Sequence, residues 1–142
     1  MKLYFMVGLP TETDDDIEGI IAVLRKISYL ALQRKGKFNI NVTLSPFNPK
    51  THTPFQWERR LDYETVDKRI KKIARGIRKP NINIKYGDLH QSLFEAVFSR
   101  GDRRLSHVIE AAFRKGARLD SWTEWFNHSL WYEATVHRTH RI

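Results

Sequence analysis

The chain contains no cysteine. The side chains best suited to chemistry are therefore its six histidines and the acidic–basic cluster at residues 102–104. His137 and His140 lie three residues apart, a spacing that can place two imidazoles on one helix face, as in some zinc sites. We interpret them as bystanders in a basic terminal segment and expect no metal site. Without a thiol, the chain offers no disulfide, no thiolate metal ligand and no cysteine nucleophile.

Two further groups have the composition of a site but also a simpler explanation. His52 lies between prolines in an extended loop, where it could approach a substrate or be a plain loop residue. Asp102 stands beside Arg103 and Arg104, residue types that can transfer protons and bind anions. A helix cap at Asp102 followed by two surface arginines explains the same residues. We therefore name no catalytic residue.

The net charge bears on binding partners. The chain has 25 Lys+Arg against 16 Asp+Glu, a formal charge of +9, which attracts polyanions such as nucleic acids. The basic residues form short runs at 69–72, 75–79, 100–104 and 138–141, and solvated helix faces explain these runs as well. A nucleic-acid-binding or protein-docking accessory domain is therefore the alternative function.

Length and hydropathy indicate the class of protein. A chain of 142 residues with 41% hydrophobic residues is typical of a folded globular domain. No apolar run approaches the roughly 20 residues that cross a bilayer, so we expect no membrane association. Residues 1–10 are too short and too soon followed by acidic residues for a signal peptide, and together with the absence of cysteine this favours a cytoplasmic location.

The first 45 residues predict a strand, a helix and a second strand. Lys2–Val7 is a short apolar run, followed by candidate N-caps at Thr11 and Thr13 and an acidic helix start that we take to include Glu12. Apolar residues at helical spacing continue to Leu30, and Gly36 is the expected helix stop.

From residue 38 the period changes to two. Phe38, Ile40, Val42 and Leu44 alternate with polar residues, which predicts a strand with one polar face. Together these elements form a βαβ unit with parallel strands. The polar face fits a barrel interior that is wet or faces a ligand, and a solvent-facing strand is the alternative.

The remaining chain is mainly helical. Pro46–Trp57 is an extended loop, 62–78 a basic amphipathic helix, 82–86 a short strand, and 90–116 two helices with Asp102 as the second cap. A last helix is expected at 121–134, with Trp122, Trp125 and Trp131 as a core or partner-docking face rather than a stacking platform for bases. We expect two parts, residues 1–60 and 61–142.

Three segments resemble one enzyme family. Met6–Thr13 (MVGLPTET) resembles the end of the fifth strand and the helix start of radical S-adenosylmethionine (radical SAM) barrels, and Val42–Phe55 (VTLSPFNPKTHTPF) resembles their sixth strand and exit loop. Phe98–Leu105 (FSRGDRRL), with Trp125 and Trp131 downstream, is similar to radical SAM proteins that follow a cobalamin-binding-type N-terminal domain. The resemblance runs from Lys2 to about Ala134.

The resemblance implies that this chain is the C-terminal part of a (βα) barrel with a helical extension. In that family a CxxxCxxC loop holds a 4Fe-4S cluster, which binds SAM and cleaves it reductively to a 5′-deoxyadenosyl radical. This sequence lacks that loop and the strands before the fifth, and iron–sulfur clusters need thiolates. We therefore expect no cofactor in this chain and no catalysis by it alone. SAM, the 4Fe-4S cluster and, in some members, cobalamin belong to the parent enzyme.

The family also suggests where the chain would touch SAM. The positions that match the adenine side of the site are Val7, Gly8 and Leu9 after the fifth strand, and Ser45 and Phe47 after the sixth. A glycine suits a backbone pressed against a ligand ring, and a plain strand-to-helix turn at Gly8 is the alternative.

The expected partner is the missing N-terminal part of the barrel. Without it, Lys2–Val7 would have an unpaired edge, which favours self-association as a dimer. Alternatively, the short strand at 82–86 covers an edge within the monomer.

Overall fold

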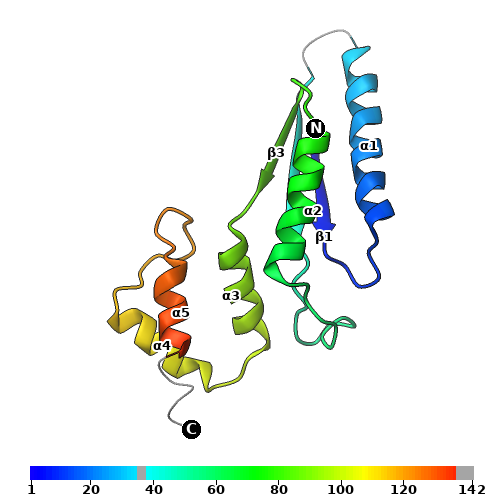
Figure 1. Ribbon diagram of the computed structural model, residues 1–142. Helices are drawn as coiled ribbons and strands as arrows, with labels where there is room; N and C mark the ends of the chain where they lie inside the picture. Colours follow the sequence, from blue (N-terminus) through cyan, green and yellow to red (C-terminus); the bar gives the residue numbers. More distant parts are fainter. Residues whose placement is uncertain (35–37, 137–142) are drawn as a thin grey trace.

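The computed structural model describes residues 1–34 and 38–136. Within these ranges the chain forms three strands and five helices (Figure 1). In chain order they are β1 (Lys2–Val7), α1 (Asp14–Leu32), β2 (Ile40–Pro46), α2 (Tyr63–Gly76), β3 (Ile82–Tyr86), α3 (Leu89–Arg100), α4 (Leu105–Arg114) and α5 (His128–Val136). The predicted α/β class is thus confirmed, whereas membership of a barrel stays a prediction.

The three strands form one parallel sheet in the order β1-β2-β3. Leu3 lies opposite Val42, and Val42 lies opposite Ile84. The third strand therefore covers one edge within the monomer, as the alternative expected, and that edge is the outer edge of β2. In the described part of the chain, no strand pairs with the outer edge of β1.

The two faces of the sheet differ sharply. Helices α1 and α2 contact each other and lie over the same face (Figure 1). They bury the apolar side chains of the strands, chiefly Val7, Ile40, Val42 and Leu44, against Ile17, Leu24, Ile70 and Ile73. The opposite face carries Tyr4, which is 71% exposed, together with the exposed residues Asn41, Asn83 and Lys85. The period-two pattern thus predicted both strand faces correctly, and the polar face is open.

Helix α1 begins with a capping box. The Thr13 hydroxyl accepts a hydrogen bond from the Asp16 N–H, and the Asp16 carboxylate accepts one from the Thr13 N–H. Thr13 is therefore the cap, and the candidate Thr11 is not. The helix ends at Leu32, before the expected stop at Gly36, which lies outside the described residues.

Buried polar contacts tie α1 to the segment that leads into β3. The Ser28 hydroxyl donates to the Asn81 side chain over 2.7 Å, and the Asn81 amide donates back to the Ser28 carbonyl. Both side chains are buried, so each satisfies the other in the core. Residues beyond 60 thus complete the core that β1, α1 and β2 begin, while the expected division of the chain at residue 60 stays a prediction.

The last three helices lie beyond the carboxyl ends of the strands (Figure 1) and share a second hydrophobic cluster. Phe94 and Trp131 are its large buried members, with ring centroids 5.8 Å apart. The predicted helix at 121–134 is wrong in its first half, because turns occupy residues 121–125 and α5 begins at His128. The Asn127 side chain accepts a hydrogen bond from the Leu130 N–H, which explains this start.

Two smaller expectations also need correction. The second strand begins at Ile40 rather than Phe38, because pairing with β3 begins at Ile40 opposite Ile82. The N-cap position of α4 is Arg104 rather than Asp102. Asp102 instead accepts the backbone N–H of Arg104 and forms an exposed ion pair with its guanidinium, which closes the turn after α3. None of the helices within residues 1–34 and 38–136 has the length and apolar character that crossing a membrane requires.

Candidate functional site

The carboxyl ends of the three parallel strands meet at one edge of the sheet, as parallel pairing requires. Met6 pairs with Ser45, and the Phe47 N–H donates to the Val7 carbonyl over 2.8 Å. The structure therefore brings Val7, Ser45 and Phe47 together, with Gly8 following directly on β1. In parallel α/β sheets this edge is where ligands bind.

The five residues expected on the adenine side of SAM differ in what they expose. Val7 and Phe47 are buried, and the Phe47 ring packs edge-on against Phe55 with centroids 5.8 Å apart. Leu9 is 38% exposed and Ser45 is exposed. The side chains open to a ligand are thus Leu9 and Ser45, whereas Val7 and Phe47 are buried.

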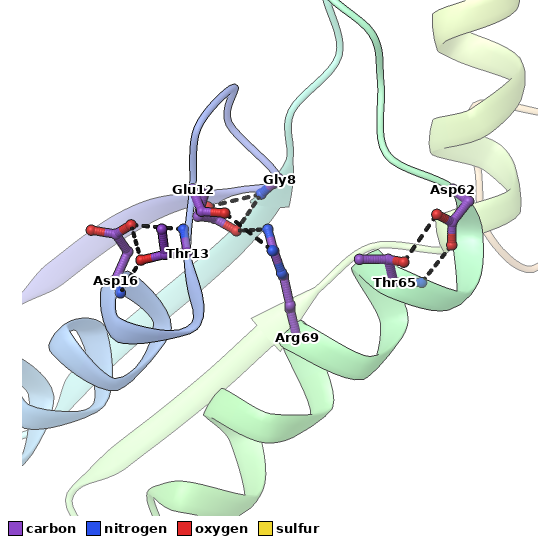
Figure 2. A network of polar contacts seen from close by, with 7 residues as sticks. All are labelled: Gly8, Glu12, Thr13, Asp16, Asp62, Thr65 and Arg69. Atoms are coloured by element: carbon purple, nitrogen blue, oxygen red, sulfur yellow. Dashed lines mark hydrogen bonds and ion pairs between the residues drawn. The ribbon is translucent and has the colours of Figure 1, made fainter.

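Gly8 is held by a carboxylate from its own loop. The Gly8 N–H donates to both oxygens of Glu12, at 2.9 and 3.0 Å (Figure 2). Arg69 of α2 donates from Nη1 to Glu12 Oε1 over 2.6 Å and from Nη2 to the Glu12 carbonyl over 3.1 Å. The Glu12 side chain is only 5% exposed and that of Arg69 16% exposed, so this ion pair is shielded from water.

This arrangement corrects the expected role of Glu12. It lies before the cap Thr13 and outside α1, so it is not an acid of the first helical turn. Its carboxylate links the end of β1 to α2 instead. Sequence reasoning missed the link because its partner Arg69 lies 57 positions away, within a helix that carries many basic residues.

The reason for glycine at position 8 is its backbone conformation. Its φ of +92° lies in the region that other residues avoid. A Cβ there would meet Leu61 and Val66 at 3.5 and 3.7 Å, which is ordinary contact with protein. The turn geometry therefore explains this glycine without a ligand.

A cavity of about 390 Å³ opens beside the carboxyl ends of β2 and β3. Its lining comes from the strand ends, the first turns of α3 and the segment after α4, and consists of Thr43, Leu44, Ser45, Pro46, Asn48, Gly87, Asp88, Gln91, Ser92, Glu95 and Ser121. Of the predicted site residues, it includes Ser45 but none of Val7, Gly8, Leu9 or Phe47. The contributions of α3 were not predicted, because helical periodicity does not show which turn of a helix faces a strand end.

A polar clamp fixes one wall of this cavity. The Asn48 amide donates to the carbonyl and hydroxyl of Ser92, and Arg60 Nε donates to Asn48 Oδ1 over 2.8 Å. Partial burial lowers the pKa of Arg60, although it stays charged at any ordinary pH. The Lys50 ammonium pairs with the Glu95 carboxylate at 2.5 Å. Loop 47–60 is thereby joined to α3.

The remaining candidate groups do not assemble into a reactive site. His52 is exposed, with a φ of +61°, and Trp122 and Trp125 are each 61% exposed. The described residues include no group of three or more His, Cys, Asp or Glu that could hold a metal. His137, His140 and the basic run 138–141 lie outside the described residues.

Three of the five basic residues of α2 form ion pairs, while Lys68 and Arg75 are exposed. Besides Arg69 with Glu12, Lys71 pairs with Asp67 at 2.6 Å and Lys72 with Glu18 at 3.0 Å. Each pair places an acid beside a base that would otherwise attract phosphate. Nucleic-acid binding through this helix stays a prediction.

Comparison with known proteins gives one informative relative. The chain is 34% identical over 131 residues to the uncharacterized protein MJ0966 of Methanocaldococcus jannaschii, a match that covers 86% of this chain and 28% of the relative. The chain thus spans little more than a quarter of that protein's length. No family model matches the chain, and no solved structure does.

Proposed function

We propose that this chain is the C-terminal part of a radical SAM enzyme, in which β1, β2 and β3 are consecutive strands of a (βα) barrel. One observation carries the proposal: the sheet is wound in one direction, with its strands in sequence order and α1 and α2 on the same face. A complete doubly wound sheet reverses its strand order and places helices on both faces, although each of its halves taken alone does neither. Strands in sequence order with all crossover helices on one face are the pattern of a barrel wall, and the three motifs that resemble radical SAM barrels favour it over half of a doubly wound sheet.

The open face supports the same proposal. Parallel sheets occur almost only with both faces covered, yet Tyr4, Asn41 and Lys85 are exposed here. In a closed barrel this face would line the interior, where polar side chains can meet water or a ligand. The unpaired edge of β1 is where a preceding strand would join.

The relative is long enough to contain the barrel strands that this chain lacks. The match covers 28% of its length, so most of that protein lies outside the matched segment. A barrel with its cluster loop could be encoded there. The three motifs that resemble radical SAM barrels lie within this chain, at the strand ends and loops described above.

The residues of this chain could contact SAM but could not bind the 4Fe-4S cluster. It has no cysteine, so it provides no ligand for a 4Fe-4S cluster, and those ligands must come from the remainder of the parent. When bound to such a cluster, SAM supplies the 5′-deoxyadenosyl radical. The contribution of this chain would be the exposed side chains of Leu9 and Ser45, with the backbone of Gly8 fixed by Glu12.

The proposal is tested on the full-length relative from Methanocaldococcus jannaschii. Anaerobic reconstitution with iron and sulfide is expected to give the visible absorbance of a 4Fe-4S cluster and, with a reductant, 5′-deoxyadenosine from SAM. This chain alone is the matched control and is expected to give neither. Absence of both signals in the relative, or a relative without a CxxxCxxC segment upstream of the match, would contradict the proposal.

A further inference from the structure

The cavity at the carboxyl ends of β2 and β3 is lined by hydroxyl groups that have no hydrogen-bond partner among the described residues. These hydroxyls indicate the class of ligand that the cavity could bind. Thr43, Ser45 and Ser121 contribute to its lining, and within the described residues no protein group forms a hydrogen bond with their hydroxyls. A volume of about 390 Å³ falls in the range of small-molecule sites. Hydroxyls that can both donate and accept suit the hydroxyls of a ligand.

The charge of the cavity lining disfavours ligands that carry a phosphate or a carboxylate. The chain has 25 Lys+Arg, yet none of them lines this cavity, whereas Asp88 and Glu95 do. Lys50 pairs with Glu95, which balances that charge. Asp88 accepts a hydrogen bond from the Gln91 N–H as the cap of α3 and pairs with no cation within residues 1–34 and 38–136. A phosphate or carboxylate would thus meet a carboxylate that only the positive N-terminal end of α3 offsets, whereas an amine would be attracted.

We propose that this cavity binds a polyhydroxylated ligand that carries no phosphate or carboxylate, and that it prefers one with an amine, such as an amino sugar. Thr43 and Ser45 bind ligand hydroxyls, and Asp88 attracts the ammonium group. The assignment of this cavity as the substrate site of a radical SAM barrel rests on the proposed function. The claim that the cavity binds such a ligand does not, because binding is measured on this chain, which cannot hold the cluster.

The experiment compares three hexoses that differ in charge. Glucosamine, glucose and glucose 6-phosphate are titrated into the isotopically labelled chain, and amide chemical shifts are followed. The amides of Ser45, Gln91 and Ser92 are expected to shift, with glucosamine binding most tightly and glucose 6-phosphate most weakly. Shifts confined to other regions, no shifts with any hexose, or tightest binding of the phosphate ester would overturn the proposal.

Two variants test the roles of the lining. Thr43→Val keeps the shape of the side chain and is expected to weaken binding of glucose and glucosamine by roughly three- to tenfold, the effect of one neutral hydrogen bond. Ser45→Ala, at an exposed position, is the second hydroxyl variant should the strand not tolerate valine. An unchanged affinity in both would overturn the assignment.

Asp88→Asn tests the amine preference, since asparagine caps a helix as well as aspartate does. Asp88→Asn is expected to lower the affinity for glucosamine to that for glucose. The matched control is Asp62→Asn, the same change at the cap of α2, which lies outside the cavity lining. Equal effects of the two variants would overturn the role of Asp88. A failed titration leaves the proposed radical SAM function standing, because that function is tested on the relative.

Discussion

At the residue scale, Glu12 connects three parts of the molecule. Its carboxylate accepts the Gly8 N–H with both oxygens and pairs with Arg69, so one side chain joins the end of β1, its own loop and α2. Burial makes this arrangement sensitive to change. A shielded charge that loses its partner costs far more than an exposed pair contributes.

Glu12→Gln should therefore lower the free energy of unfolding by about 3 kcal/mol, because it leaves the shielded guanidinium of Arg69 without a counter-charge. Denaturant unfolding followed by circular dichroism measures the change. Glu18→Gln is the control. It breaks the exposed pair with Lys72 and should lower the free energy of unfolding far less than Glu12→Gln does. Equal losses in both variants would show that water screens the Glu12 pair as well.

Thr11 holds a backbone conformation that suits glycine. The Glu12 N–H donates to the Leu9 carbonyl, which closes a turn with Pro10 and Thr11 at its centre. Thr11 has a φ of +66°, and positive φ at the third position of a turn is typical of glycine. Threonine is β-branched and is strained there.

Thr11→Gly should raise stability by about 0.5–1 kcal/mol, the strain relieved less the extra freedom that glycine gives the unfolded chain. Thermal unfolding measures the gain. Thr51→Gly, at an exposed turn position without positive φ, should lower stability instead. A loss of stability in Thr11→Gly would mean that the threonine side chain contributes more than its backbone strain costs.

At the element scale, the start of α1 depends on pH. Hydrogen bonds from the backbone N–H and the hydroxyl of Thr13 hold the pKa of Asp16 below its ordinary value of 3.8. Since the pKa is lower in the folded state, the charged carboxylate contributes stability above about pH 3.8. That contribution is lost as the pH falls through the folded-state pKa.

Asp16→Asn should therefore destabilise the protein near neutral pH, and the difference from the unmodified chain should shrink as the pH falls below 3.8. Unfolding by urea at several pH values measures this difference. Asp15→Asn changes a neighbouring carboxylate of the same turn that is not in the capping box. A difference of the same size and pH dependence in both variants would assign the effect to the helix dipole alone.

How far the elements could be predicted depends on how local their signals are. The alternation from Ile40 to Leu44 and the helical spacing from Ile17 to Leu24 are properties of short segments, and both elements form where they were expected. The last helix was misplaced because the tryptophans at 122 and 125 mimic an apolar helix face, although Asn127 caps the helix further on.

The candidate site was less predictable, for the same reason. Ser45 was named only because the resemblance to radical SAM barrels implies it, as a residue on the adenine side of SAM, and the structure places it in the cavity lining. The wall contributed by Gln91 and Ser92 depends on how α3 is placed relative to the sheet, and Ser121 joins it from the segment after α4. The contacts that place it, such as Asn48 with Ser92, join residues 44 positions apart and leave no local pattern.

At the scale of the whole molecule, the outer edge of β1 stays open among the described residues. Beside it on the open face stand Tyr4 and Met6, which are 71% and 48% exposed. Unpaired backbone groups next to apolar side chains invite another chain to pair.

We therefore expect the isolated chain to form a dimer at tens of micromolar protein, as measured by light scattering. Tyr4→Lys places a charge on this edge strand and should shift the chain to monomer, whereas Tyr29→Lys on the exposed side of α1 should not. A monomer whose Lys2–Val7 amides are protected from hydrogen exchange would contradict the prediction and show that the edge is covered within one chain.

The parallel register of the sheet also has a kinetic consequence. Leu3 pairs with Val42, and Val42 pairs with Ile84, so each strand pair joins residues about 40 positions apart and no hairpin can form first. The chain must close these long loops before the sheet provides any stabilisation, and topologies rich in distant contacts fold slowly. During synthesis β1 could pair with β2 only after α1 and β2 had emerged. Stopped-flow refolding should therefore be slower than that of helical bundles of similar length, and it should slow further as protein concentration and competing association rise.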